Sequence, residues 1–441
     1  MSVIQVRGLK PLKGELTIQG SKNAVLPMLA AAFLHRGVTV LRNVPRIRDA
    51  AYMTEILESL DCHCRWQEGE LTVDAKEAGG NQIPEYYVTS MRSSVLFLSA
   101  LLGRTGEGIS SYPGGCLIGA RPIDLHLKVL KAFGGQVEET EGKLHVSCKE
   151  KRGLVGADID LPYPSVGATE QAIIAAVAAR GDTRIRGAAR EPEILQLCTF
   201  LNNMGASIEG GGESCLKIQG GRKLHDSCYE VEGDRIVAGT YGAAAAAAGG
   251  EILLRGIDPG ILEEPLKALR QAGVFVREDP RGKQILLKAS GRPRPLKLET
   301  GPYPAFPTDL QSPFMAFLSA GQGESMIREK VFEGRFRAAL ELQKMGAEIR
   351  IEGQTAWIQG HYPLKGAEAA ACDLRGGAAL IVAALAAEGT SEIRGCRHIE
   401  RGYEDICRDL QLLGADAKWT KRQESFLAEQ AQEYENCSRK G

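Results

Sequence analysis

Six stretches of the chain share one hydrophobic pattern, in which an apolar, alanine- and leucine-rich segment leads into a short alternation of apolar and polar residues. The apolar part predicts a helix, and the alternating part predicts a half-buried strand. The stretches are 30–42, 96–111, 173–186, 243–255, 314–328 and 380–394, of which 96–111 is the weakest copy. Residues 243–248 are apolar on every side, so we expect that helix to be buried inside a domain and surrounded by sheets.

A turn that ends a helix and begins a strand recurs between these stretches. Its central residues are Asp61, Gly134, Gly205, Gly273, Gly346 and Gly414, at intervals of about 70 residues. Glycine suits a left-handed C-terminal helix cap, and aspartate is tolerated there. The repeats divide into three plus three, which predicts two similar lobes with a cleft between them, a favoured place for a small ligand.

Length and composition agree with a globular protein of more than one domain. The chain has 441 residues, 44% of them hydrophobic and 25% charged, which favours two or three domains. The formal net charge is -1, so no global field attracts nucleic acid or a membrane. We expect any anion site to depend on local lysine and arginine side chains.

The first 20 residues lack the apolar run of a signal peptide, and no charge-free apolar segment is long enough to span a membrane. We therefore expect a cytoplasmic protein whose eleven cysteines are reduced thiols. Cys62 and Cys64 flank His63, which makes a metal site conceivable. The alternating pattern favours instead a strand with two small buried side chains. The polar tail 420–441 is expected to have no catalytic role.

Two segments combine glycines with a reactive or cationic side chain. In Gln19–Ala24, Lys22 lies at a helix start beside free backbone N–H groups, which favours anion binding, although such lysines are usually solvated. In Tyr112–Pro122, glycines surround Cys116, and Arg121 follows five residues later. A nearby cation can activate a thiol. A surface loop with an incidental cysteine is the equal alternative.

Other segments permit both a structural and a functional interpretation. In Pro164–Glu170, Ser165 or Thr169 is expected to cap the following helix, with Glu170 in its first turn, and the same amides can hold a phosphate. Asp309 follows two prolines and is either a helix N-cap or a functional carboxylate. Arg375 and Arg401 each precede a glycine and can form ordinary salt bridges.

Taken together, these segments resemble the enolpyruvyl transferase family, in particular its UDP-N-acetylglucosamine 1-carboxyvinyltransferases, which begin bacterial peptidoglycan synthesis. The resemblance covers about residues 1–418. It is carried, in the family's order, by QGSKNAVLP, MRSS, PGGCLIGARPIDLH, PSVGATE, AAREPEI, DRIVAGT, PAFPTD, VFEGRF, DLRGG and HIERGYE.

The resemblance implies an α/β fold, the inside-out α/β barrel, with two lobes of three βαβαββ units each. One lobe is expected to comprise 22–232, with the Cys116 loop. The other is expected to comprise 1–21 together with 233–419, followed by the tail 420–441. The chain is then expected to cross between the lobes near Ser21 and near Glu232.

The implied reaction adds the 3-hydroxyl of UDP-N-acetylglucosamine to phosphoenolpyruvate and then eliminates phosphate, with no cofactor and no metal. Lys22, Arg121 and Arg401 match the family residues that hold phosphate and carboxylate, and Arg92 and Arg375 match further arginines of the cleft. Asp309 matches the carboxylate that serves as the candidate base. Cys116 matches the thiol proposed to protonate the substrate and able to form a covalent phosphoenolpyruvate adduct. A thiol there also implies inactivation by the epoxide fosfomycin.

The family residues that contact the UDP-sugar match Asn23, Arg121, Pro122, Ile123, Asp124, Leu125, Ser165, Val166 and Gly167, and Val331 matches a contact with the sugar. Asp49 and Glu191 match acidic residues near the cleft. No nucleic-acid or membrane partner is expected, and the oligomeric state is left open. The associated processes are peptidoglycan and cell-wall synthesis, cell shape, cell division and the cell cycle.

The chain departs from the usual family motifs at Tyr303, Gly334 and Ala338. Two alternatives therefore stay open. One is enolpyruvyl transfer to shikimate 3-phosphate, against which the Cys116 loop and Ser165–Gly167 argue. The other is a diverged, non-catalytic copy that binds a nucleotide sugar.

Overall fold

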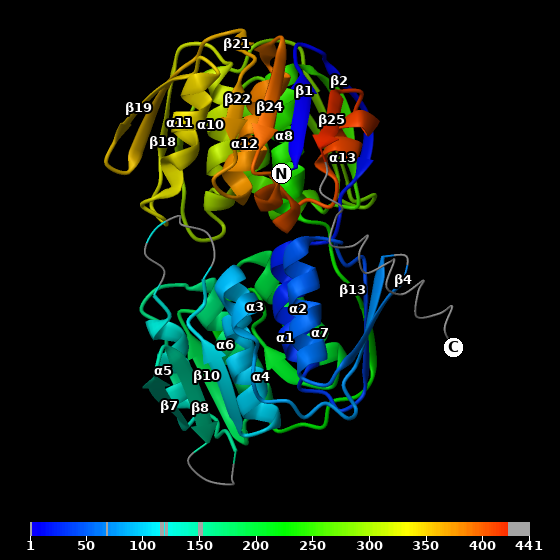
Figure 1. Ribbon diagram of the computed structural model, residues 1–441, viewed down its shortest axis with the longest axis vertical. Coiled ribbons are helices and arrows are strands. Elements are labelled where there is room, and N and C mark those ends of the chain that lie inside the picture. The colour runs from blue at the N-terminus through cyan, green and yellow to red at the C-terminus, as the bar shows by residue number, and fades with distance from the viewer. Residues whose placement is uncertain (1, 68, 115–118, 120–121, 149–152, 422–441) are drawn as a thin grey trace.

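The computed structural model describes residues 2–67, 69–114, 119, 122–148 and 153–421, and these form two stacked lobes (Figure 1). The first lobe has a hydrophobic core drawn from Ala24 to Val231. The core of the second lobe takes residues from Ile4 to Ile18 and from Ile236 to Ala417. The first strands of the chain thus complete the lobe that the C-terminal half builds. The exact lobe boundaries given above stay a prediction.

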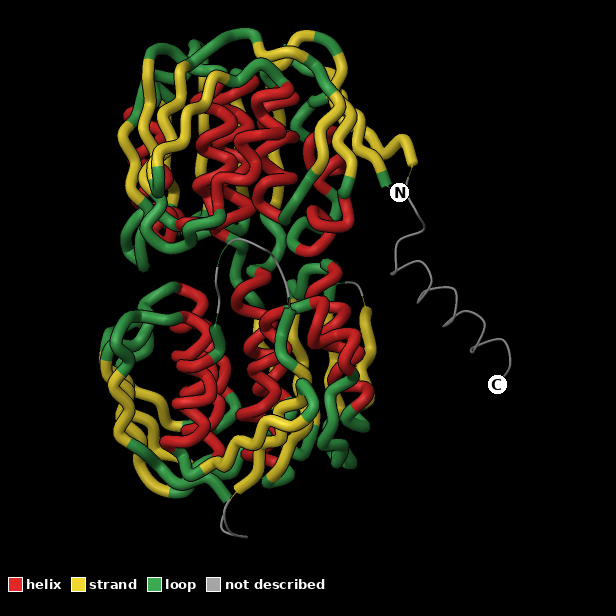
Figure 2. Tube along the Cα trace, turned by 60° about the vertical axis from the view of Figure 1, so that its left-hand side comes forward, coloured by secondary structure: helices red, strands yellow, loops and turns green. Residues whose placement is uncertain are grey.

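Sheets form the outside of each lobe and helices fill the inside (Figure 2). In the first lobe the strand orders are β13-β3-β5-β4, β6-β8-β7 and β11-β12-β10-β9. These strands are β3 Val38–Arg42, β4 His63–Gln67, β5 Glu70–Asp74, β6 Glu107–Ser111, β7 Gly135–Thr140, β8 Lys143–Cys148, β9 Asp158–Asp160, β10 Gly181–Arg186, β11 Ser207–Glu209, β12 Cys215–Gly220 and β13 Ser227–Glu230. Its helices are α1 Lys22–Ala32, α2 Arg48–Ser59, α3 Glu85–Ser90, η1 Arg92–Leu96, α4 Phe97–Arg104, α5 Asp124–Ala132, α6 Val166–Ala178 and α7 Pro192–Asn203.

The second lobe repeats this plan with strand orders β15-β16-β14-β2, β17-β18-β20-β19 and β22-β24-β1-β25, and β21 pairs with β23. The strands are β1 Val3–Arg7, β2 Leu12–Thr17, β14 Gly250–Arg255, β15 Phe275–Asp279, β16 Gln284–Ala289, β17 Lys297–Glu299, β18 Glu324–Arg328, β19 Glu348–Glu352, β20 Thr355–Gln359, β21 Leu364–Lys365, β22 Glu368–Ala370, β23 Ala387–Glu388, β24 Thr390–Arg394 and β25 Asp416–Lys421. The helices are α8 Arg235–Ala248, η2 Pro259–Leu262, α9 Glu263–Gln271, η3 Thr308–Leu310, α10 Gln311–Ser319, η4 Arg335–Arg337, α11 Ala338–Lys344, α12 Leu374–Leu385, η5 Cys396–Arg401 and α13 Ile406–Leu412.

The apolar helices of the repeated pattern are the inner helices of the two lobes. In the second lobe α8, α10 and α12 pack against one another, and every residue of α12 is buried. Gly239 permits the close approach of α8 to η3, because a Cβ there would lie 2.4 Å from Leu310 Cδ1. A helix without a polar face must be covered on all sides, and the surrounding sheets provide that cover. The predicted inside-out α/β barrel is therefore confirmed.

The recurring turn residues have the left-handed backbone that the repeat predicts. The φ angles are 65° at Asp61, 87° at Gly134, 102° at Gly205, 97° at Gly273, 84° at Gly346 and 80° at Gly414. Each turn places the strand that follows it against the helix of its own unit.

The cysteine pair near residue 63 belongs to the core rather than to a metal site. Cys62 and Cys64 are 3% and 7% exposed, and His63 between them points to solvent, as the alternation of a strand requires. Among the described residues, no cluster of three His, Cys, Asp or Glu side chains is arranged to hold a metal ion.

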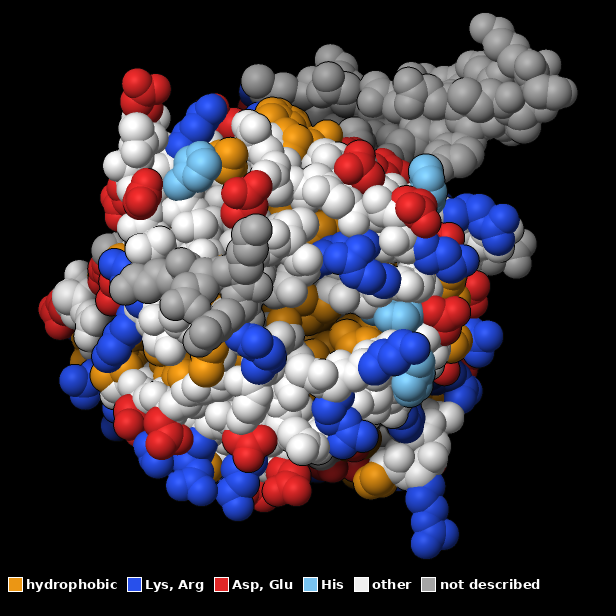
Figure 3. Space-filling model, turned by 90° about the horizontal axis from the view of Figure 1, so that it is seen from below, with side chains coloured by type: hydrophobic (Ala, Val, Ile, Leu, Met, Phe, Trp, Pro, Cys, Tyr) orange, Lys and Arg blue, Asp and Glu red, His pale blue; other side chains and the backbone are white. Residues whose placement is uncertain are grey.

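No helix of the described residues is long and apolar enough to cross a membrane. On the face shown in Figure 3, cationic and acidic side chains are interspersed, in keeping with a net charge of -1.

The two passages of the chain between the lobes lie side by side. Ser21 N–H donates to Glu232 O at 2.8 Å, and Asp234 N–H donates to Gln19 O at 2.8 Å. The Asp234 carboxylate then accepts from the backbone N–H of Lys22 at 3.0 Å and of Ile236 at 2.8 Å. One side chain thus caps the starts of both α1 and α8, which places Lys22 at the junction of the lobes.

The burial of the inner helices predicts that two leucine substitutions differ strongly in their effect on the free energy of unfolding. Leu380 is 1% exposed on α12, whereas Leu340 is 67% exposed on α11. We expect Leu380→Ala to lower the free energy of unfolding by about 2–5 kcal/mol through lost contacts and a cavity. Leu340→Ala is expected to change it by less than about 0.5 kcal/mol. Denaturant unfolding checks this, and equal effects of the two substitutions would contradict the buried position of α12.

Candidate active site

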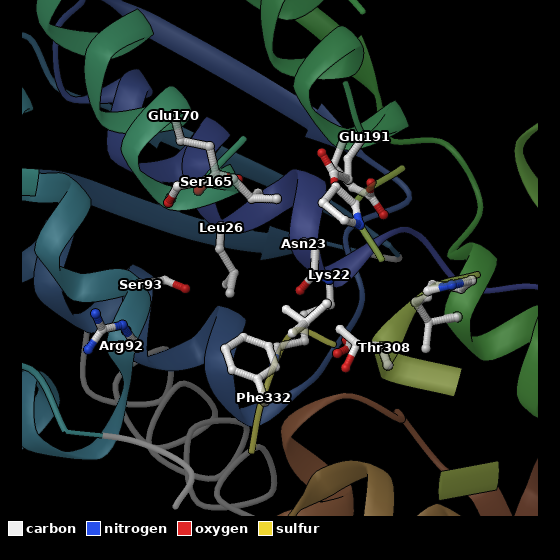
Figure 4. Close-up of a pocket in the computed structure, with 18 of the residues that line it drawn as sticks. Lys22, Asn23, Leu26, Arg92, Ser93, Ser165, Glu170, Glu191, Thr308 and Phe332 are labelled. Atoms are coloured by element: carbon white, nitrogen blue, oxygen red, sulfur yellow. The ribbon is translucent and has the colours of Figure 1, made fainter. Parts of the chain in front are cut away.

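A cleft of about 660 Å³ lies between the lobes and is lined by residues of both (Figure 4). The first lobe contributes the starts of α1, η1 and α6, and the second contributes η3, η4, η5 and the start of α12. Helix starts carry unpaired N–H groups and the positive end of the helix dipole, so this arrangement favours anionic ligands.

The first charged cluster of the cleft joins the two lobes through one carboxylate. Lys22 Nζ lies 2.8 Å from Asp49 Oδ2. Arg401, from the second lobe, donates from Nε to Asp49 Oδ1 at 2.7 Å and from Nη2 to Oδ2 at 3.1 Å. Asp49 is only 1% exposed, and Lys22 and Arg401 line the cleft above it.

Charge balance makes this cluster cationic. Burial by itself raises the pKa of Asp49, but Lys22 and Arg401 outweigh it and hold the pKa below its ordinary value of 3.8. Asp49 is therefore ionised near neutral pH. One negative charge between two positive ones leaves an excess positive charge facing the cleft.

The second charged cluster repeats this arrangement within the second lobe. Arg335 Nη2 donates to Asp309 Oδ1 at 2.8 Å, and Arg375 donates to Asp309 Oδ2 from Nη2 at 2.9 Å. Burial favours a higher pKa at Asp309, but the two arginines lower it well below the ordinary value. Arg335 Nε and Arg375 Nη1 are buried and have no hydrogen-bond partner among the described residues.

The N-cap interpretation of Asp309 is wrong. Pro307 is the N-cap of η3, and Asp309 lies within its turn without a capping bond, since its carboxylate faces the two arginines. Arg335 escaped the sequence analysis as a site residue, although it belongs to the VFEGRF segment that carried part of the resemblance. Its ion pair with Asp309 and its position in the lining of the cleft assign it to the site.

A buried carboxylate fixes the backbone around this second cluster. Glu329 is 0% exposed and accepts hydrogen bonds from Thr308 Oγ1 at 2.9 Å, Val331 N at 2.8 Å and Phe332 N at 3.0 Å. Thr308 Oγ1 in turn accepts from Arg335 Nη1 at 2.8 Å. Glu329 therefore orients both the loop that carries Val331 and the arginine beside Asp309. No sequence signal marks it, because its partners are mainly backbone groups.

A third group forms an acidic wall on the first-lobe side of the cleft. Arg235 donates to Glu193 from Nε at 3.0 Å and from Nη2 at 3.2 Å, and both side chains are buried. Glu170 and Glu191 also line the cleft here. Tyr303 N–H, from the second lobe, donates to Glu191 Oε1 at 3.3 Å, so this wall also joins the lobes.

At the start of α6 the expected cap is present, but the expected acidic residue in the first turn is not. Ser165 Oγ accepts from Ala168 N at 3.4 Å, which confirms Ser165 as the cap. Thr169 instead donates to Ser165 O at 2.8 Å. Glu170 lies beyond the first turn, so its expected position there is wrong. Gly167 permits His126 to pack against the helix start, because a Cβ would lie 2.9 Å from His126 Cε1.

Most of the residues singled out from the sequence line this one cleft. They are Lys22, Asn23, Arg92, Pro122, Leu125, Ser165, Val166, Gly167, Asp309, Val331, Arg375 and Arg401, together with Asp49 and Glu191. Ile123 is buried at the start of α5 and Asp124 points to solvent, so neither is among the residues that line the cleft. Cys116 and Arg121 lie outside the described residues. Of the three departures from the family motifs, only Tyr303 lines the cleft.

Comparison with known proteins relates the chain to one family. Residues 6–410 match the family model described as EPSP synthase (3-phosphoshikimate 1-carboxyvinyltransferase). The chain is 43% identical to UDP-N-acetylglucosamine 1-carboxyvinyltransferase 2 of Caldanaerobacter subterraneus subsp. tengcongensis, over 94% of this chain and 99% of the relative. It is 43% identical to UDP-N-acetylglucosamine 1-carboxyvinyltransferase of Trichlorobacter lovleyi, over 94% of this chain and 98% of the relative.

Solved structures show the same fold. The enolpyruvyl transferase NikO from Streptomyces tendae superimposes with a TM-score of 0.86 at 25% identity, covering 96% of this chain and 99% of that one. EPSP synthase from Acinetobacter baumannii has a TM-score of 0.73 at 18% identity, covering 96% and 100%. At 18% identity the likeness concerns the fold alone.

The buried position of Asp49 predicts a pH-dependent loss of stability when its charge is removed. We expect Asp49→Asn to lower the free energy of unfolding by about 3 kcal/mol or more at pH 7, because two cations lose their shared partner. The pKa of Asp49 is lowered by folding, so the stabilisation is complete above the ordinary value of 3.8 and is lost as the pH falls from there through the lowered pKa of the folded state. The difference between the two proteins should therefore shrink at about pH 3.

Denaturant unfolding of both proteins at the two pH values measures this difference. Asp158→Asn is a matched control, because the Asp158 side chain is 68% exposed and forms only a long surface ion pair with Arg186. Its effect is expected to stay within about 0.5 kcal/mol. A difference between wild type and Asp49→Asn that grows on acidification would contradict the assignment.

Proposed function

The chain belongs to the EPSP synthase (3-phosphoshikimate 1-carboxyvinyltransferase) family and, within it, to the UDP-N-acetylglucosamine 1-carboxyvinyltransferases, and on this premise we propose its reaction. It transfers the enolpyruvyl group of phosphoenolpyruvate to the 3-hydroxyl of UDP-N-acetylglucosamine and releases phosphate. The names of relatives at 43% identity over nearly the whole chain support this acceptor. The observation that carries the proposal is the pair of carboxylates, Asp49 and Asp309, each held between two cations at one interlobe cleft.

The reaction proceeds by addition and then elimination. The 3-hydroxyl oxygen forms a bond to C2 of phosphoenolpyruvate while C3 gains a proton. The tetrahedral intermediate then loses phosphate from C2 and a proton from C3, which restores the double bond. Positive charge develops at C2 on the way, so the site must stabilise both that carbon and the anionic groups around it.

The cationic clusters suit the anionic groups of the substrates. Lys22 and Arg401, whose positions Asp49 fixes, bind the phosphate. Arg121, which lies outside the described residues, is proposed to bind it with them. Arg92 and Arg375 add positive charge along the cleft, and the planar guanidinium groups suit bidentate contacts with carboxylate and phosphate. These fixed cations provide the charge stabilisation within the chain itself, and we propose neither a cofactor nor a metal.

Asp309 is the proposed base for the 3-hydroxyl. With both arginines in contact, its lowered pKa makes it a weak base in the free protein. Anionic substrates that engage Arg335 and Arg375 compete for these cations and raise the pKa of Asp309 again. The carboxylate thus gains basicity when the substrates are bound, which limits proton removal to the assembled complex.

The finer roles come from the resemblance. Cys116 protonates C3 and forms the covalent adduct with phosphoenolpyruvate. Asn23, Pro122, Leu125, Ser165, Val166 and Gly167 contact the UDP-sugar, and Val331 contacts the sugar ring. The protein acts in the cytoplasm, in peptidoglycan synthesis, and through it in cell shape, cell division and the cell cycle.

A phosphate-release assay with purified protein and both substrates tests the proposal. Release with phosphoenolpyruvate and UDP-N-acetylglucosamine supports it. Release only with shikimate 3-phosphate would assign the chain to the other branch of the family. Binding of UDP-N-acetylglucosamine without release would identify a non-catalytic copy and overturn the proposal.

The role of Asp309 predicts a loss of turnover when its charge is removed. We expect Asp309→Asn to lower kcat by about a hundredfold or more, because it removes the base that positions and deprotonates the hydroxyl. Steady-state kinetics measure this loss. Asp160→Asn is the control, since the Asp160 side chain is 72% exposed and is not among the residues that line the cleft. Turnover of Asp309→Asn close to wild type would remove Asp309 from the mechanism.

The thiol at position 116 predicts inactivation by fosfomycin. The thiolate sulfur bonds to an epoxide carbon, the carbon–oxygen bond opens, and the oxygen takes up a proton. We expect time-dependent loss of activity and a mass increase of one fosfomycin per chain. Cys116→Asp should resist, whereas Cys228→Ser, which removes an exposed cysteine on β13 that does not line the cleft, should stay sensitive. Equal sensitivity of wild type and Cys116→Asp would contradict the assignment.

A further inference from the structure

Glu170 is a buried carboxyl group that neither the fold nor the proposed mechanism explains. It lies on α6, one turn beyond the helix start that lines the cleft, and it is only 7% exposed. It lines the cleft itself, and Figure 4 shows it beside Ser165 on the same wall. Among the described residues, no hydrogen bond or ion pair engages its carboxyl group. A buried polar group without a partner is costly unless a ligand satisfies it.

The surroundings of Glu170 disfavour a negative charge. Glu193 and Glu191 lie on the same wall, at the start of α7. The nearby cation, Arg235, is already engaged in a bidentate pair with Glu193. Glu191 Oε1 accepts from Tyr303 N, and its Oε2 is buried without a partner among the described residues.

Several other charged groups of the cleft have partners of their own. Lys22 contacts Asp49, and Arg375 and Arg335 contact Asp309. His126, on α5, packs against the α6 start at Gly167. Burial, together with Glu193 and Glu191, raises the pKa of Glu170 well above its ordinary value.

We propose that Glu170 meets the nucleotide sugar as a neutral carboxylic acid and donates a hydrogen bond to one of its oxygen atoms. The inference rests on the proposed function, because the start of α6 is where Ser165, Val166 and Gly167 contact the UDP-sugar. A carboxylate at this point would repel a diphosphate, whereas a protonated carboxyl group offers it an O–H donor. On this wall Glu170 thus offers the ligand a donor, whereas Glu193 stays paired with Arg235.

Two substitutions of Glu170 distinguish a neutral hydrogen-bond donor from an ionised carboxylate. Glu170→Gln keeps the size and a hydrogen-bond donor but cannot ionise, whereas Glu170→Met keeps the length and removes the donor. Calorimetry with UDP-N-acetylglucosamine, without phosphoenolpyruvate, gives the dissociation constant of each protein from about pH 6 to about pH 9. Unfolding midpoints establish that each variant is folded.

A neutral donor has three expected consequences. Glu170→Met weakens binding by about tenfold or more at pH 7. Glu170→Gln restores the affinity to within about threefold of wild type at the same pH. Wild type loses affinity as the pH rises, because Glu170 ionises, and Glu170→Gln loses less over the same range. The KM for phosphoenolpyruvate stays within about twofold in both variants, since this group touches only the nucleotide sugar.

Other outcomes overturn the inference. If Glu170→Gln binds as weakly as Glu170→Met, the wild-type group acts as a carboxylate acceptor. If Glu170→Met binds as tightly as wild type, Glu170 does not contact the ligand. Failure of wild type itself to bind UDP-N-acetylglucosamine would instead overturn the proposed function, so the two failures are distinguishable.

Discussion

The site depends on one carboxylate shared by two cations from opposite lobes. Asp49 lies between Lys22 and Arg401 and holds the nitrogens of both within 3.1 Å of its oxygens. These two cations are 379 sequence positions apart. Lysine and arginine side chains placed alone at a cleft would repel each other and extend into solvent. A buried anion between them fixes their positions and still leaves positive charge for a ligand.

The Asp309 cluster repeats this arrangement in the same cleft, with one carboxylate held between two cations. It shows why the positions of the charges matter more than their number. Arg335 and Arg375 leave Asp309 ionised but weakly basic, and Glu329 fixes Arg335 through Thr308. Charges set in place before a ligand arrives need no rearrangement during the reaction, which is the main source of electrostatic catalysis. Glu170 differs from both aspartates, since its burial without a cation of its own favours the neutral form.

The inner helices provide the rigidity that these clusters require. Functional groups at the starts of α1, α6 and α12 are carried by helices whose bodies are buried in the lobe cores. Asp234 ties the start of α1 to the start of α8 at the point where the chain passes between lobes. Lys22 is therefore positioned by both lobes, although it belongs to the core-forming helix of only one.

The sequence by itself determined the repeats, the buried helices, the left-handed turns and part of the lining of the cleft, because each of these depends on local patterns or on motifs that span a few residues. It did not identify Arg335 or Glu329, it placed Glu170 in the first turn of a helix, and it left Asp309 undecided between a cap and a functional carboxylate. Those assignments rest on pairs such as Asp49 with Arg401 and Asp309 with Arg375, which lie far apart in the chain. Charge pairing and burial are properties of distance in space, and only the tertiary structure sets that distance.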